Sequence, residues 1–168
     1  MIRRATIVDI ERILSIVRSA QLSLRELGID QWQDGYPRRE NIVSDIADGV
    51  GWVVVDDDDN AIGYAAIPLT GEEAYLQLQD DDWHTSSHYV VVHRLCVDGT
   101  IRRRGVAMQL MNHAITLARE AGLDGFRIDT HRGNIRMLSL VEKLGFKYCG
   151  VVRYDSGERL AFDLKITK

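Results

Sequence analysis

Residues Val97–Met111 read VDGTIRRRGVAMQLM, and this stretch joins three consecutive arginines to a glycine and an apolar helical pattern. A tight turn that runs from a strand into a helix presents unpaired backbone N–H groups, where the peptide dipoles also favour negative charge. Small residues such as Gly105 and Ala107 let a phosphate oxygen approach the backbone, and the arginines add cationic donors. The stretch therefore predicts an anion site, with a pyrophosphate as the anion. A solvated charge run at the start of a helix is the alternative interpretation.

Neither of two better-known phosphate loops occurs in the chain, which contains no Gly-x4-Gly-Lys-Ser/Thr and no Gly-x-Gly-x-x-Gly pattern. The arginine stretch also contrasts with the whole chain, whose formal net charge is -4. That acidic balance argues against nucleic acid as a partner, because nucleic-acid-binding proteins usually present a basic face.

Length and composition are those of one globular domain over residues 1–168. Of the 168 residues, 45% are hydrophobic and 27% are charged, which is enough to bury a substantial core. Met1 is followed at once by IRRAT, and no run approaches the ~18 apolar residues of a membrane helix. We therefore expect a cytoplasmic protein without a membrane partner. Cys96 and Cys149 lie in apolar runs, which predicts free buried thiols and neither a disulfide scaffold nor a metal site.

Hydrophobic periodicity and turn residues predict a mixed chain of helices and strands. Thr6 with Asp9 three residues on marks the start of a helix that continues to Gly28, and Pro37 opens a second helix that ends near Gly49. The expected order is strand 2–6, helices 6–28 and 37–49, strands 52–55, 61–67 and 88–97, helix 105–122, strand 126–130, helix 134–145, and strands 147–153 and 159–166.

Two parts of this prediction depend on local composition. The run DDDDN at 56–60 lies between two apolar strands and predicts the tip of a hairpin. The run HYVVVHRLCV at 88–97 is almost continuously apolar, which predicts one long strand buried on both faces. The polar stretch 70–87 before it is expected to be a loop that could hold a short strand around 75–78.

Several segments in this order resemble the GNAT acyltransferase superfamily. RRRGVA at 102–107 is similar to the superfamily signature Arg/Gln-x-x-Gly-x-Gly/Ala, and it follows the strand HRLCV by a few residues. DTHRGN at 129–134, a short amphipathic helix and KLGFKYCG at 143–150 resemble the next segment of the superfamily. Gln31 and Trp32 resemble a subgroup of small bacterial members. The resemblance covers residues 88–150 well, and the first half agrees in element order.

This resemblance implies an α/β (α+β) fold with a mixed, mostly antiparallel sheet of six or seven strands and about four helices. It implies that acetyl-CoA, the co-substrate, lies in a V-shaped splay between the strands at 94–97 and 127–130. A backbone N–H near Leu95 or Cys96 would polarise the thioester carbonyl. The residues implied to bind acetyl-CoA are Leu95, Cys96, Val97, Arg102, Arg103, Arg104, Gly105, Val106, Ala107, Met108 and Asn134. For Asn134, a plain helix N-cap is the alternative and is compatible with that role.

His93 is the candidate general base for the reaction that the resemblance implies. An acceptor amine must be neutral before it can attack the thioester, so a proton must leave it. His93 precedes Val97 by four residues, which predicts that it shares a strand face with Leu95 and Val97, and its reference pKa near ~6.5 suits neutral pH. A structural histidine at the edge of the core is the alternative.

The chain departs from the superfamily at the usual general acid. A tyrosine often occupies the eighth residue of the Asn-led helix, but that residue here is Val141. Tyr89, Tyr148, Tyr154 or solvent remain as candidates. A CoA thiolate is a tolerable leaving group near neutral pH, so we expect turnover to be slower and not abolished.

The sequence predicts an N-acetyltransferase that acts on a primary amine of a small molecule, as a monomer or homodimer. Acidic runs at 56–59, 72–73 and 80–82 would attract a cationic amine if they line its cleft, although solvated turns are the alternative. Trp32, Tyr36 and Trp83 are candidates for apolar walls of that cleft, or for ordinary packing. A non-catalytic acyl-CoA sensor and a protein or peptide N-terminal acetyltransferase are the alternative functions.

Overall fold

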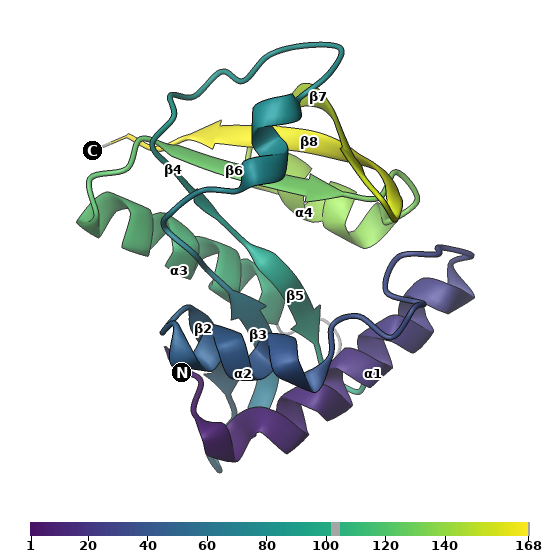
Figure 1. The fold of residues 1–168 in the computed structure, drawn as a ribbon. Helices are drawn as coiled ribbons and strands as arrows, with labels where there is room; N and C mark the ends of the chain where they lie inside the picture. Colours follow the sequence, from purple (N-terminus) through teal and green to yellow (C-terminus); the bar gives the residue numbers. More distant parts are fainter. Residues whose placement is uncertain (102–104, 168) are drawn as a thin grey trace. The chain divides into compact units, whose positions relative to one another are not determined.

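The computed structural model describes residues 1–101 and 105–167 (Figure 1). Arg102, Arg103 and Arg104, which were expected to bind an anion, therefore lie outside the described residues. The chain divides into two compact units. The first unit comprises Met1–Ile67 and His93–Asn112, and the second comprises Pro68–Val92 and His113–Lys168. The single domain expected over residues 1–168 stays a prediction.

The first unit is built on an antiparallel sheet of four strands in the order β1-β2-β3-β5. Its strands are β1 (Ile2–Arg4), β2 (Gly51–Val55), β3 (Ala61–Ala66) and β5 (His93–Val97). Helices α1 (Ile10–Glu26) and α2 (Arg39–Ala47) cover one face of this sheet (Figure 1). The start of α3 (Val106–Glu120) covers the other face, where Val106 and Leu110 pack against the bare backbone of Gly63.

Local signals in the first unit behave as predicted. The Asp9 carboxylate accepts hydrogen bonds from the Thr6 N–H at 2.8 Å and from the Thr6 hydroxyl at 3.1 Å, at the short 3-10 helix η1 (Ile7–Asp9) that precedes α1. The acidic run between β2 and β3 forms the hairpin tip, with Asp59 at a φ of 64°. Buried apolar side chains of α1, α2 and the sheet form the core of this unit: Ile10, Ile13, Ile16, Val17, Ile42, Val53, Val55 and Tyr64.

The second unit contains a sheet of four strands in the order β4-β6-β8-β7. Its strands are β4 (Tyr89–Val91), β6 (Gly125–Thr130), β7 (Lys147–Tyr154) and β8 (Gly157–Lys165). Among the described strand pairs of the chain, β4 with β6 is parallel and the others are antiparallel. The short 3-10 helix η2 (Glu73–Gln77) and helix α4 (Ile135–Lys143) lie on opposite faces of this sheet (Figure 1).

The long strand predicted at 88–97 is in fact two strands. β4 pairs with β6 in the second unit, whereas β5 pairs with β3 in the first unit, and the break falls at Val92. The total is therefore eight strands in two sheets within the described residues, against the six or seven expected in one. The mixed, mostly antiparallel α/β architecture is confirmed.

Two smaller predictions were wrong, one about the type of an element and one about where a helix begins. The short strand considered at 75–78 is the 3-10 helix η2. The Glu72 side chain caps this helix by accepting from the N–H of Ala74 at 3.2 Å. Helix α2 begins at Arg39 and not at Pro37, whose peptide bond with Tyr36 is cis.

The segment before β4 has irregular backbone and is fixed to the sheet by two charged side chains. Asp163 on β8 accepts hydrogen bonds from the N–H groups of His84 and Thr85 at 2.7 and 2.8 Å. Arg127 on β6 donates to the carbonyl oxygens of Thr85 and Ser86, both at 2.8 Å. These two side chains supply hydrogen bonds to backbone groups that have no strand partner. The segment therefore keeps a defined path without secondary structure.

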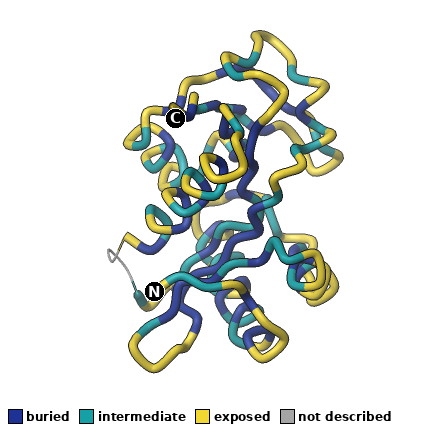
Figure 2. The backbone as a smooth tube through the Cα atoms, turned by 90° about the vertical axis from the view of Figure 1, so that its left-hand side faces the viewer, coloured by how far each residue is buried: buried dark blue, intermediate teal, exposed yellow. Residues whose placement is uncertain are grey.

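The distribution of burial follows the elements within each unit. Strands carry most of the buried residues, and exposed residues gather in the turns and along the outer sides of the helices (Figure 2). In the described ranges, no helix combines the length and the apolar character that crossing a membrane requires.

Candidate active site

Strand β5 contains a β-bulge at the centre of the predicted site. Cys96 pairs with Tyr64, but the next pair along the two strands is His93 with Ala66, so Arg94 and Leu95 together face Ala65. Arg94 has a φ of 54°, a conformation that side-chain-bearing residues rarely adopt. A bulge leaves one residue out of the ladder, so it frees backbone polar groups at this point. These groups lie where the backbone N–H donor near Leu95 or Cys96 was predicted.

Arg94 ties this bulge to helix α2 and to the segment before it. Its guanidinium forms an ion pair with Asp45 on α2, with Nε 2.8 Å from Oδ2, and its Nη1 donates to the Tyr36 hydroxyl at 2.7 Å. The Tyr64 hydroxyl of β3 also donates to Asp45 Oδ2 at 2.5 Å. Burial and the Asp45 carboxylate both raise the pKa of Tyr64, so this hydroxyl stays protonated. The network therefore holds the bulge in one conformation.

The bulge changes the face on which His93 lies. His93 pairs with Ala66, which shares a strand face with Tyr64, and Tyr64 pairs with Cys96. His93 thus lies on the face of Tyr64 and Cys96 and not, as predicted, on the face of Leu95 and Val97. The extra residue of the bulge reverses the alternation that the spacing of four implied. The role of His93 as general base stays a prediction.

Asp98 lies directly after β5, and its side chain holds the turn at residues 98–101 that precedes the three arginines. Asp98 Oδ1 accepts from the N–H and the hydroxyl of Thr100 at 2.9 and 2.8 Å, and its Oδ2 pairs with Arg12 of α1. Burial raises the pKa of this carboxyl, but the hydrogen bonds from Thr100 and Arg12 outweigh burial and hold the pKa below its ordinary value. Asp98 is therefore ionised at neutral pH and keeps the turn tight.

Gly105 directly precedes α3. Its φ is +65°, and among the residues that the structure describes none would lie within 4 Å of a Cβ added there. Val106 is buried beneath the sheet of the first unit, whereas Ala107 and Met108 are partly exposed. The first N–H groups of a helix have no partner within it, and here they follow an open glycine. This arrangement fits an anionic group such as a pyrophosphate.

The second unit holds the remaining predicted residues. Asn134 caps α4, because its side-chain oxygen accepts from the N–H of Met137 at 3.3 Å, which confirms the N-cap interpretation. Val141 is only 2% exposed, so an apolar side chain fills the position where the superfamily often has a tyrosine. The part of Asn134 in binding acetyl-CoA stays a prediction.

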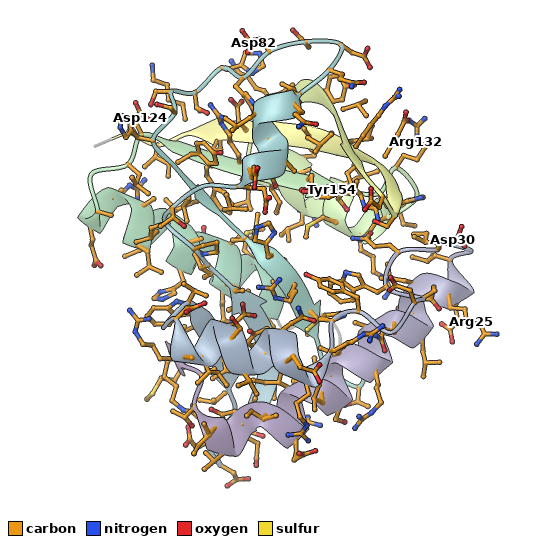
Figure 3. The ribbon with its side chains drawn as sticks, in the orientation of Figure 1. Arg25, Asp30, Asp82, Asp124, Arg132 and Tyr154 are labelled. Atoms are coloured by element: carbon orange, nitrogen blue, oxygen red, sulfur yellow. The ribbon has the colours of Figure 1, made fainter. Side chains whose placement is uncertain are left out.

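A carboxylate with two tyrosine donors lies in the same unit. The hydroxyls of Tyr75 and Tyr154 donate to Asp129 Oδ2 at 2.7 and 2.8 Å, and Tyr154 lies at the end of β7 (Figure 3). Burial, followed by the charge of Asp129, raises the pKa of both tyrosines. Of the other acid candidates, Tyr148 is 47% exposed and Tyr89 is buried with its hydroxyl near the backbone of Glu72. Tyr154 is thus a protonated donor already engaged by a carboxylate.

Cys96 has no reactive character in this arrangement. Its thiol is 4% exposed, and burial raises its pKa to about 12. The resemblance assigned Cys96 to the site through its backbone only, and the buried neutral thiol agrees with that assignment. Both cysteines are free, as predicted.

Comparison with known proteins identifies the family. A sequence model of the acetyltransferase (GNAT) family matches residues 17–146. The chain belongs to the GNAT acetyltransferase family. Acetyl transfer from acetyl-CoA is the general chemistry of that family. The family predicted from the sequence is therefore confirmed.

Solved structures and one curated protein extend this result. A GNAT-family acetyltransferase from Streptococcus agalactiae is 35% identical with a TM-score of 0.89, over 100% of this chain and 95% of that one. The PaiA N-acetyltransferase of Thermoplasma acidophilum, solved with coenzyme A, shares the fold at a TM-score of 0.72 and 18% identity, over 98% of each chain. The chloroplastic GCN5-related N-acetyltransferase 6 of Arabidopsis thaliana is 30% identical over 71 residues, which are 42% of this chain and 25% of that protein.

Sequence reasoning missed two side-chain networks, one in each unit. The Asp45 network had one available signal, since an aspartate at the apolar spacing of Ile42 and Ile46 on α2 indicates a buried carboxylate that needs a partner. The cluster at Asp129 had none, because Tyr75 and Tyr154 lie 54 and 25 residues from it along the chain.

Proposed function

We propose that this protein transfers the acetyl group of acetyl-CoA to the primary amine of a small molecule. The observation that carries the proposal is the bulge of β5, with backbone groups freed beside Leu95, followed by an open glycine at the start of α3. In a family whose members bind an acyl-CoA, the first feature suits a thioester carbonyl and the second suits a pyrophosphate.

The proposed reaction needs a proton acceptor for the amine and a hydrogen-bond donor for the oxyanion. His93 would accept the proton of the amine, whose nitrogen then attacks the thioester carbon. A backbone N–H near Leu95 or Cys96 would donate to the oxyanion that forms, and the Arg94 network would keep that N–H in place. The carbonyl reforms as the carbon–sulfur bond breaks. The sulfur leaves as a thiolate, which takes its proton from solvent or from a nearby hydroxyl such as that of Tyr154.

The other proposed residues would bind the donor. Asn134 would donate an amide hydrogen bond to the pantetheine arm while its oxygen caps α4. Leu95 and Val97 would pair with the arm as an added strand would, and Arg102, Arg103 and Arg104 would supply charge to the phosphates. The N–H groups of Gly105, Val106, Ala107 and Met108 would hold the pyrophosphate.

A second function is favoured by Val141. Without a tyrosine at that position, the chain would serve as an acyl-CoA-binding sensor that turns over poorly. Release of free thiol from acetyl-CoA across a panel of small amines and short peptides separates the proposals. Amine-dependent release supports the enzyme and identifies its acceptor class. Tight binding of CoA without release on any amine supports the sensor, and no binding contradicts both.

A further inference from the structure

The geometry points to a divalent-metal site of the zinc class, formed by His84, Cys149 and Asp163 on the second unit. The nearest donor atoms are His84 Nδ1 to Asp163 Oδ1 at 3.0 Å and Cys149 Sγ to His84 Nδ1 at 3.3 Å. One ligand atom of each residue lies within 4.8 Å of the other two. Ligands about 2.0–2.3 Å from a tetrahedral metal lie roughly 3 to 4 Å from one another, so the distances from His84 to Asp163 and to Cys149 match those between ligands of such a site.

The fold presents two of these ligands from rigid strands. Cys149 is the extra residue of a bulge in β7, because Tyr148 pairs with Phe162 and Gly150 pairs with Ala161. Asp163 pairs with Lys147 on the same strand pair, and Cys149 follows Lys147 by two residues, so strand alternation places the thiol on the face of Asp163. Gly150 permits this path, since a Cβ there would lie 2.2 Å from the backbone oxygen of Gln79. The side chains of Cys149 and Asp163 are buried.

Asp163 is oriented by contacts that leave one oxygen for the metal. Its Oδ2 accepts the N–H groups of His84 and Thr85, so Oδ1 faces the imidazole and the thiol. A carboxylate held in this way by hydrogen bonds to its other oxygen is a common arrangement around metal ligands. The 1% exposure of the Asp163 side chain keeps that oxygen from bulk water.

His84 supplies the path to solvent and the third donor. Its side chain is 46% exposed and belongs to the irregular segment before β4, two residues after Asp82 in the sequence. An ion can therefore reach the buried thiol and carboxylate along the imidazole, and a water can complete four-coordination. One sulfur, one nitrogen and one oxygen donor suit zinc or cobalt, whereas calcium and magnesium prefer oxygen alone.

The metal would change the protonation of one ligand. Burial and the neighbouring Asp163 carboxylate raise the pKa of Cys149 to about 12, so without metal the thiol is neutral and donates to the Lys147 carbonyl at 3.3 Å. On binding, the metal–sulfur bond forms as the thiol proton leaves to solvent. The thiolate and the carboxylate together then balance the two charges of the ion.

The test uses cobalt(II) as an optical probe on the 168-residue chain after treatment with a chelator. We expect a thiolate-to-cobalt charge-transfer band at one equivalent of cobalt, and its displacement by zinc. His84→Ala, a change at an exposed side chain, should weaken cobalt binding by at least ~10-fold. Cys149→Ser should abolish the band. The matched controls are His88→Ala, an exposed histidine four residues on, and Cys96→Ala, the other buried thiol, and both should keep the band.

The outcomes separate a metal site from a hydrogen-bonded anchor. If excess cobalt produces no band in the unaltered protein, the three groups only satisfy one another and the proposal is wrong. A band that survives His84→Ala with unchanged affinity, or that disappears with Cys96→Ala in a folded variant, also overturns it. Circular dichroism of each variant establishes folding. The readout is independent of acetyl transfer, so failure of the proposed function leaves this test intact.

Discussion

Each of the two units holds a largely enclosed arginine, and the two are accommodated in different ways. Arg94 in the first unit, with 16% of its side chain exposed, pairs directly with the Asp45 carboxylate. Arg127 in the second unit is 6% exposed, and its guanidinium lies 4.3 and 4.0 Å from the ring centroids of Trp83 and Tyr89. Its guanidinium donates hydrogen bonds to the neutral oxygens of Thr85 and Ser86.

The pKa values of the two arginines shift in opposite directions. Burial lowers the pKa of Arg94, but the bonds to Asp45 outweigh burial and the net shift is upward. For Arg127, burial dominates and the pKa is lowered. Hydrogen bonds between an arginine and a carboxylate are strong and directional, so this pair can hold a strained bulge. An arginine between aromatic rings with carbonyl partners holds an irregular segment instead, since it satisfies the backbone of that segment.

The largest expected effect comes from replacing the glycines that flank α3, Gly105 in the first unit and Gly122 in the second. Gly105→Glu should abolish CoA binding, measured by calorimetry, because a side chain and a negative charge would occupy the proposed pyrophosphate position. Gly122→Glu is the matched control: its φ is +71° and it too has nothing within 4 Å of an added Cβ. Both variants carry similar backbone strain, so unchanged affinity in Gly105→Glu, or equal loss in both, would remove the support for the site.

His93→Ala tests whether chemistry depends on the first unit. We expect kcat/KM to fall by ~10² to 10⁴, with CoA affinity unchanged, because the amine loses its proton acceptor. His88→Ala in the second unit, an exposed histidine, should keep full activity. Activity that persists in His93→Ala with the same pH profile would show that His93 is structural.

The contrast between the arginines can be measured with double-mutant cycles of unfolding free energy. Arg94→Ala should destabilise the protein by ~3–5 kcal/mol, because it leaves the buried Asp45 carboxylate without its cation. Adding Asp45→Asn should recover part of that loss. The equivalent cycle of Arg127→Ala with Asp163→Asn should show weaker coupling, because these two side chains bind different backbone groups. Equal coupling in the two cycles would contradict the distinction drawn here.

Val141→Tyr tests whether the second unit has lost a general acid. The proposed location near the CoA sulfur predicts a higher kcat on an identified amine, because a hydroxyl would protonate the departing thiolate. The change enlarges a side chain that is 2% exposed, and we expect overpacking to cost ~1–3 kcal/mol of stability. Thermal unfolding is measured beside the rate. A folded variant with no gain would mean that another donor serves or that this proton transfer does not limit turnover.

The smallest expected effect is the acid sensitivity of the turn after β5. Because the folded-state pKa of Asp98 is lowered, its stabilising contribution is present above the unfolded pKa of ~3.9 and is lost as pH falls through the folded value. Asp98→Asn should therefore be less stable at neutral pH and lose less stability on acidification below about pH 4. Asp56→Asn, at the exposed hairpin tip, has a carboxyl whose pKa is also lowered and should change the profile less. Identical profiles for all three proteins would contradict the role of Asp98.

Much of this fold was predictable because its signals are local. The Thr6 and Asp9 cap, the acidic hairpin tip at 56–60 and the glycines at 105 and 122 each act on residues within a few positions of themselves. The order of helices and strands follows from periodicity in the same way. The candidate cofactor residues were predictable through the family pattern, which is also a contiguous stretch.

The errors arose where distant partners decide the outcome. Nothing in HYVVVHRLCV indicates that its first half pairs with β6 and its second half with β3, because both ladders accept the same apolar residues. The face of His93 depends on a bulge held by Asp45, which lies 49 residues from Arg94 along the chain. The convergence of His84, Cys149 and Asp163 likewise joins residues up to 79 positions apart.

The sequence by itself determined the family, the element order and the glycine that begins α3, since these depend on short-range patterns and backbone preferences. Only the tertiary structure decided where the long strand divides, which face His93 occupies, and which carboxylates meet Arg94, Tyr154 and Cys149. The physical reason is that a side chain's partner is chosen by strand register and burial. Those are properties of chain segments brought together by folding, and no local pattern records them.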